Sequence, residues 1–152
     1  MPTARIVGAS DLSRLLELYE ALFAASEASS IAEPRDRAER IWCQMLAREG
    51  VTVFVGEAGD KFAASCTLIT APNLLRAGRG HAFLENVVTH PACRGQGYGR
   101  AVVQAALTTA WAEDCYHVLL QSGRADPRVH RFYESLGFEP GIRVGYVARR
   151  PR

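Results

Sequence analysis

The sequence predicts an α+β protein built on one mixed β-sheet. Segments with apolar residues at helical spacing alternate with segments rich in β-branched and aromatic residues. The expected order is strand, two helices, three strands, helix, strand, helix, strand, so hairpins and a crossover occur in one sheet. The 152 residues suffice for one domain, which we expect to span 1–152.

The first half predicts a strand, two helices and a hairpin. A short strand is expected at 4–8, after which Ser10 and Asp11 offer N-cap oxygens to a helix. That helix carries an apolar stripe from Leu12 to Phe23. Pro34 suits the first position of the second helix, whose own apolar stripe includes Ile41, Trp42, Met45 and Leu46 and which Gly50 ends. β-Branched residues and a turn at 58–60 then predict paired strands at 51–55 and 61–70.

The second half returns from strand to helix twice. After a loop at 71–80, a strand is expected at 81–89 and a helix at 97–112, where apolar residues lie on one face. A buried type of strand follows at 117–121. Pro127 begins a short helix that Gly137 ends, and a final strand is expected at 142–149.

Composition and charge exclude several classes of protein. The chain has 18 Lys and Arg against 16 Asp and Glu, so its net charge of +2 gives no support to nucleic-acid binding. No apolar run approaches the ~18 residues of a membrane-spanning helix, and the first residues show no secretory signal. The four cysteines form no C-x-x-C pair and the histidines show no ligand spacing. We therefore expect a cytoplasmic protein with reduced thiols, no metal site and no membrane partner.

A glycine-rich turn between a strand and a helix is the most informative feature. Gly95, Gly97 and Gly99 remove side chains where backbone amides approach a ligand, and the helix N-terminus adds unpaired N–H groups. Together they predict an anion site suited to a diphosphate, flanked by Arg94 and Arg100. The dinucleotide pattern G-x-G-x-x-G fails because residue 100 is arginine, and the P-loop pattern fails because no Gly-Lys pair occurs.

These residues resemble the GNAT superfamily of N-acetyltransferases. The run Arg94-Gly-Gln-Gly-Tyr-Gly99 is similar to the family motif R/Q-x-x-G-x-G/A, and Glu85 to Pro91 resembles the strand that leads into it. The run from His130 to Phe138 resembles the closing F-Y-x-x-x-G-F motif. The resemblance implies a three-layer α/β/α fold whose mixed, mostly antiparallel sheet splays apart between its fourth and fifth strands.

The resemblance implies acetyl-CoA as the donor and assigns residues to it. The pantetheine arm is expected on the backbone of Val87, Val88 and Thr89. Where many members carry Asn, seven positions before Tyr133, this chain has Asp126, which is therefore the corresponding cofactor residue with altered chemistry. The diphosphate is expected on the turn and helix start, formed by Arg94, Gly95, Gln96, Gly97, Tyr98, Gly99 and Arg100.

Acetylation of an amine requires a base, because an alkyl amine is protonated at neutral pH. Glu85 is the candidate base, since it interrupts an apolar strand where burial raises a carboxyl pKa. A carboxylate on a solvent face is the alternative interpretation. Tyr133 is the candidate general acid for the leaving thiolate, and the backbone N–H of Val88 is the expected oxyanion donor.

The acceptor is open, with a small-molecule amine expected rather than nucleic acid. Arg76 and Arg79 are candidate contacts to an acceptor phosphate or carboxylate, although two solvated loop charges fit the sequence equally well. Cys93 is not needed for direct transfer. The alternatives are a non-catalytic acyl-CoA sensor of the same fold and, less favoured, a dinucleotide oxidoreductase. Homodimers are common among members of the family, so a homodimer is one expected assembly.

Overall fold

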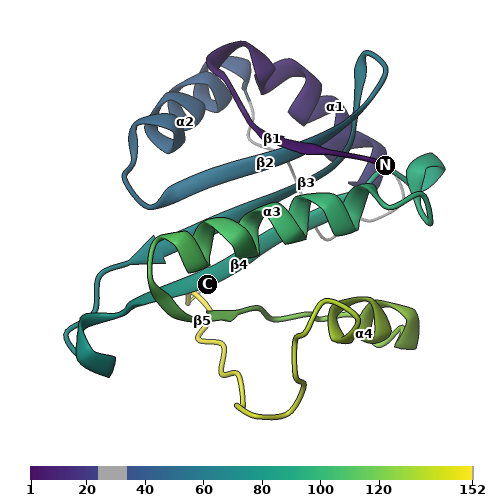
Figure 1. Cartoon of the computed structure of the whole chain (residues 1–152). Coiled ribbons are helices and arrows are strands. Elements are labelled where there is room, and N and C mark those ends of the chain that lie inside the picture. The colour runs from purple at the N-terminus through teal and green to yellow at the C-terminus, as the bar shows by residue number, and fades with distance from the viewer. Residues whose placement is uncertain (24–33, 152) are drawn as a thin grey trace. The chain divides into compact units, whose positions relative to one another are not determined.

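The computed structural model describes residues 1–23 and 34–151, and Figure 1 shows the chain. Residues Met1–Leu120 and Gln121–Arg152 form two compact units. The first unit contains strands β1 (Ala4–Ile6), β2 (Val51–Ala58), β3 (Lys61–Ala71), β4 (Gly80–Thr89) and β5 (Cys115–Leu119), and helices α1 (Leu12–Phe23), α2 (Arg35–Ala47) and α3 (Tyr98–Ala112). Single 3₁₀ turns lie at Ala9–Asp11, Arg76–Gly78 and Pro91–Cys93. Helix α4 (Pro127–Glu134) belongs to the second unit.

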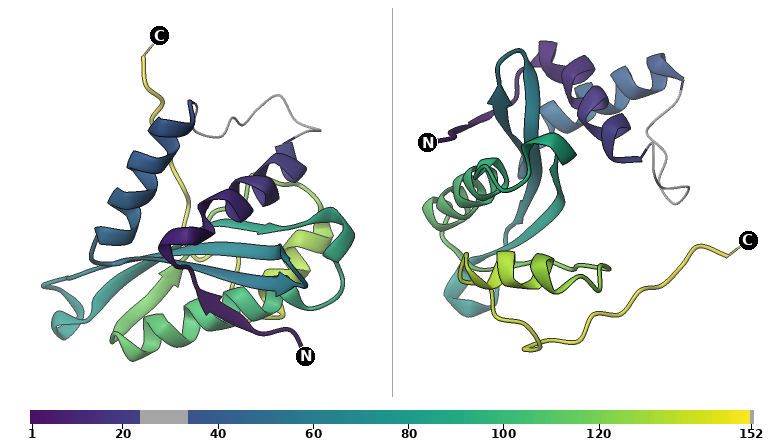
Figure 2. Two further views of the ribbon diagram at one scale, coloured as in Figure 1. Left: turned by 90° about the horizontal axis from the view of Figure 1, so that it is seen from above. Right: turned by 90° about the vertical axis from the view of Figure 1, so that its right-hand side faces the viewer.

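The five strands form one sheet in the order β1-β2-β3-β4-β5. The first four pair antiparallel, whereas β5 pairs parallel with β4. The last β4–β5 pair is Phe83 with Leu119, while β4 itself continues to Thr89. Helices α1 and α2 lie on one side of the sheet and α3 on the other, as the right-hand view of Figure 2 shows. The predicted mixed, splayed sheet and its layers of helices are thereby confirmed.

Each face of the sheet has its own apolar core. On the α3 side, Val102, Val103 and Ala106 are fully buried, and the thiol of Cys66 donates a 3.3 Å hydrogen bond to the carbonyl of Val102. On the other side, the predicted stripe of α1 packs with residues of α2 and the strands. The buried residues of this second core are Val7, Leu12, Leu15, Leu18, Trp42, Val53, Val55 and Phe62. Burial of one such large side chain contributes about 1.5–3 kcal/mol, so these faces hold the sheet and helices together.

An ion-pair network joins the first strand to α1 and β2. The guanidinium of Arg5 contacts Asp11 at 2.7 Å and Glu57 at 2.8 Å, and Arg14 reaches the same Glu57 oxygen at 2.8 Å. Arg14 also lies 4.1 Å from the ring centre of Phe62. The hydrogen bond from Arg5 holds the pKa of Asp11 below its usual value. The network therefore joins β1, α1 and the β2–β3 hairpin through charge as well as apolar contact.

The expected strand at 142–149 is wrong, because the structure shows no strand there. Ile142, Val144, Tyr146 and Val147 are instead 68–89% exposed, so the segment's apolar pattern has no packed face among the residues described. Several boundaries also shift: β1 ends at Ile6 rather than 8, β2 continues to Ala58, and β5 ends at Leu119 rather than 121. β5 begins at Cys115 rather than 117, and Pro34 precedes the first residue of α2. Within the described ranges, no helix is both long and apolar enough to span a membrane.

Candidate active site

A β-bulge in β4 determines which side chains face the same way. Thr67 of β3 lies opposite Glu85 and Ser65 lies opposite Val88, so Asn86 and Val87 together face a single residue of β3. Asn86 has a φ of +50°, an uncommon left-handed conformation that the bulge requires. Because Ser65 and Thr67 share one face, their partners Glu85 and Val88 also share it, although three positions separate them.

Glu85 lies on the exposed surface of this face. The structure therefore does not provide the burial expected for a carboxyl in an apolar strand, because only the alternating Ala82 and Leu84 point into the core. Directly opposite Glu85, Thr67 is 4% exposed, and its hydroxyl oxygen is buried with no hydrogen-bond partner among the described residues.

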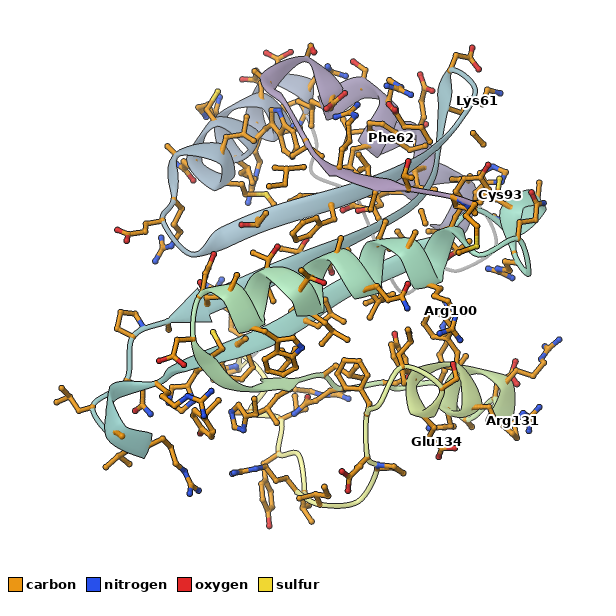
Figure 3. All side chains as sticks on the ribbon, in the orientation of Figure 1. Lys61, Phe62, Cys93, Arg100, Arg131 and Glu134 are labelled. Carbon is orange, nitrogen blue, oxygen red and sulfur yellow. The ribbon has the colours of Figure 1, made fainter. Side chains whose placement is uncertain are left out.

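The glycine turn forms an open helix N-terminus. Gly95 and Gly97 have φ values of +74° and +90°, which glycine adopts without the steric cost of a side chain. Gly97 is the N-cap of α3 and, because it is a glycine, supplies no capping side chain to that terminus. A methyl group built on Gly95 meets no protein atom within 4 Å. Cys93 and Arg100, labelled in Figure 3, mark the end of α3 at which this turn lies.

The amides of this turn and of the first turn of α3 are the groups that bind anions in such a geometry. The helix has 15 residues, so its aligned peptide dipoles place a partial positive charge at its N-terminus. Arg94, Gly95, Gln96 and Gly97 are exposed, and Gly99 is buried against the sheet. The residues predicted to hold a diphosphate are thus brought together at one helix end. Their binding of a ligand stays a prediction.

Tyr133 and Asp126 belong to the second unit. Tyr133 lies in α4, where its ring contacts Phe132 and Phe138 with centroids 5.1 Å and 5.8 Å apart. Asp126 is the N-cap of α4: its carboxylate accepts a 2.9 Å hydrogen bond from the backbone of Arg128 and a 2.8 Å contact from that arginine's guanidinium. Helix capping therefore accounts for the carboxylate of Asp126, and the roles of both residues toward a ligand stay predictions.

The two loop arginines have different surroundings. Arg79 pairs with Asp114 at 2.9 Å. The guanidinium of Arg76 lies 5.4 Å from the ring centre of Tyr116 in β5. The hydroxyl of that tyrosine is 3.2 Å from Nδ1 of His81 at the start of β4. Sequence inspection missed this contact, because 35 residues separate the two and only the parallel β4–β5 pairing joins them.

The cysteines do not contribute a reactive thiol to the described chemistry. All four are free, and Cys43 is exposed whereas Cys66 and Cys115 are buried. Burial raises the pKa of Cys66 to about 12, so its thiol stays protonated at neutral pH. Cys93 is half-buried beside the glycine turn.

The chain is similar to known acetyltransferases in both sequence and structure. The acetyltransferase (GNAT) family matches residues 13–138. A glucosamine 6-phosphate N-acetyltransferase from Trypanosoma brucei brucei is 32% identical over 139 residues, which cover 88% of this chain and 86% of the relative. A glucosamine 6-phosphate N-acetyltransferase 1 from Oryza sativa subsp. japonica is 34% identical over 89 residues, 57% of this chain and 51% of that one. A solved structure from Agrobacterium tumefaciens str. C58 superposes with a TM-score of 0.87 at 44% identity, covering 97% of this chain and 99% of that chain.

Proposed function

Because the chain belongs to the GNAT family of acetyltransferases, we propose that it acetylates the amine of a phosphorylated amino sugar with acetyl-CoA as donor. The choice of acceptor rests on the relative from Trypanosoma brucei brucei, which is named a glucosamine 6-phosphate N-acetyltransferase and matches 88% of this chain. The relative from Oryza sativa bears the same name over a shorter stretch. An amino sugar phosphate also fits the expectation of a small-molecule amine.

The donor site consists of main-chain groups in two segments. The N-terminus of α3 and the turn at 94–99 bind the diphosphate, with Gly95 and Gly97 allowing close approach of a ligand to the backbone. Val87, Val88 and Thr89, which follow the bulge, hold the pantetheine arm. Acetyl-CoA supplies an acetyl group activated as a thioester.

The chain's own side chains move the protons. Glu85 removes a proton from the acceptor amine, directly or through a water molecule, and its exposed position on β4 leaves it accessible to a soluble acceptor. The N–H of Val88, on the same side of the bulge, donates to the carbonyl oxygen as negative charge develops. Tyr133 gives its proton to the leaving sulfur.

A panel of acceptors tests this function. The purified chain is incubated with acetyl-CoA and, separately, glucosamine 6-phosphate, glucosamine, spermidine and a peptide with a free N-terminus. Thiol release is measured and the products are identified by mass spectrometry. We expect thiol release to match formation of the N-acetylated sugar phosphate, with the other acceptors at least about tenfold poorer in kcat/KM.

Two results contradict the proposal in different ways. Turnover that is fastest with spermidine or with the peptide would reject the sugar phosphate while leaving acetyl transfer intact. Binding of CoA without turnover of any amine would favour the sensor interpretation, in which the fold binds the thioester without transferring its acyl group.

A further inference from the structure

Four side chains at the paired starts of β4 and β5 form a cluster that includes three basic groups. We call Arg76, His81, Tyr116 and His117 the basic-aromatic cluster. The ring centroids of Tyr116 and His117 are 3.9 Å apart, and those of His81 and His117 are 5.7 Å apart. The guanidinium carbon of Arg76 lies over the Tyr116 ring, 5.4 Å from its centre. Arg76, His81 and His117 therefore converge on one tyrosine from a loop and two strands.

Arg76 brings a permanent positive charge to this cluster. Asp114, which lies between α3 and β5, is engaged with Arg79. Within the residues described, no carboxylate comes within ion-pair distance of Arg76. An anion bound beside the Arg76 guanidinium therefore lowers the free energy of the arrangement.

The loop that carries Arg76 has a defined conformation. The side-chain amide of Asn73 donates to the carbonyls of Leu75 and Arg79 at 3.0 Å and 3.2 Å, which ties both ends of the turn together. Arg76 and Ala77 have φ values of +56° and +57°, a conformation that costs free energy for residues with side chains. The chain thus holds Arg76 over Tyr116 at an energetic cost, as is typical of functional positions.

His81 can present a donor to an anion. When the Tyr116 hydroxyl donates to Nδ1 of His81, the hydrogen of the neutral imidazole lies on Nε2, and the protonated imidazole also carries a hydrogen there. A phosphate oxygen accepts hydrogen bonds from such a group and from a guanidinium.

Alternation along β4 aligns this cluster with the proposed base. His81, Phe83 and Glu85 occupy alternate positions and therefore share one face of the strand. Phe83 is 39% exposed, so an aromatic surface lies between a basic end and an acidic end. At about 3.3 Å per residue, His81 and Glu85 are about 13 Å apart along the strand. A hexosamine 6-phosphate has the same order of features: an amine, a ring with an apolar face, and a phosphate.

We propose that the basic-aromatic cluster binds the phosphate of the acceptor, with Phe83 beneath the sugar ring and the amine directed toward Glu85. This inference rests on the proposed function, because it takes the phosphorylated amino sugar as the acceptor. It adds the residues that distinguish the phosphorylated sugar from the free one, of which the sequence indicated only Arg76. It also separates Arg76 from Arg79, whose charge Asp114 already neutralises.

Steady-state kinetics of variants test the subsite. Arg76→Ala and His81→Ala are compared with the unaltered protein, using glucosamine 6-phosphate and glucosamine as acceptors at saturating acetyl-CoA. Each variant loses a charge-assisted contact, so we expect KM for glucosamine 6-phosphate to rise about 10- to 100-fold while kcat stays within about twofold. Kinetics with glucosamine should change little. Arg76→Lys should recover part of the loss, because a lysine keeps the charge but not the planar fork.

A matched control removes an arginine elsewhere. Arg40 is exposed on α2 and pairs with Asp36 at 3.0 Å, so Arg40→Ala should alter neither acceptor's KM. The KM for acetyl-CoA, which also carries phosphates, should be unchanged in the Arg76 and His81 variants. A rise in KM for acetyl-CoA alone would assign the cluster to the donor and overturn the proposal.

A binding measurement separates this proposal from the proposed function. Imidazole resonances of the histidines are followed by NMR as glucosamine 6-phosphate or inorganic phosphate is added, in the unaltered protein and in His81→Asn. We expect saturable shifts at His81 that disappear in the variant. If these shifts occur without turnover, the function is wrong and the anion site stands. If turnover is normal but Arg76→Ala and the His81 resonances show no effect, the subsite is wrong and the function stands.

Discussion

Replacing Gly95 with alanine separates the glycine turn's role in ligand binding from its role in the fold. Gly95 has a φ of +74°, and Gly59, in the β2–β3 turn, has a φ of +64°. A methyl group built on either residue meets no protein atom within 4 Å. Both substitutions therefore carry the same penalty, about 1–2 kcal/mol for a left-handed alanine, with no added clash. For a chain of this size, that penalty lowers Tm by about 2–8 °C in both variants.

Only the Gly95 variant should also lose affinity for CoA. The alanine methyl stands at the open helix end where we place the diphosphate, so we expect the Kd for CoA to rise about tenfold or more. The assay is calorimetric titration of CoA into both variants, alongside thermal melting to verify the matched loss of stability. Equal Kd values in Gly95→Ala and Gly59→Ala would refute the placement of the diphosphate on this turn.

Other predictions concern catalysis, pH and thiol reactivity. Glu85→Gln should lower kcat about 10²- to 10⁴-fold, and a pH–rate profile that overlays that of the unaltered protein would exclude Glu85 as the base. Tyr133→Phe should lower kcat by a similar factor with the Kd for CoA retained, and an unchanged kcat would remove Tyr133 from the mechanism. The hydrogen bond from Arg5 lowers the pKa of Asp11 in the folded chain, so the pair stabilises the protein above the unfolded carboxyl pKa of about 3.9. Stability should therefore fall as the pH drops below that value, and urea titrations of Asp11→Asn should lack this part of the fall. Burial raises the pKa of Cys66 to about 12, so iodoacetamide at pH 8 should label this thiol only after unfolding in urea, as mass spectrometry of the peptides would reveal.

The local elements could largely be predicted from the sequence, because their signals lie within a few residues. The stripe from Leu12 to Phe23 and the β-branched run after Gly50 appear as α1 and β2. The expected strand at 142–149 is the exception. Its alternating apolar residues satisfy the strand pattern, yet a strand also needs a neighbour with which to pair, and a sequence pattern does not identify that neighbour.

The candidate site was predictable in part, for the same reason. The turn at 94–99 could be predicted because it has three glycines close together, and a glycine at the start of a helix indicates a special backbone conformation or a close approach of a ligand. The bulge at Asn86 could not be predicted in this way, because asparagine tolerates a left-handed conformation but does not require it. The contact between His81 and Tyr116 depends on the parallel register of two strands far apart in sequence. The exposure of Glu85 likewise depends on which face of β4 the helices leave uncovered.

Amide hydrogen exchange with and without CoA tests the central claim most directly, because the proposed donor site consists of main-chain N–H groups. We expect CoA to slow exchange in peptides that cover 94–100 and 86–89, and to leave the turn at 58–60 unchanged. Slowed exchange confined to other segments, or none at a CoA concentration that saturates turnover, would contradict the claim that these amides hold the donor.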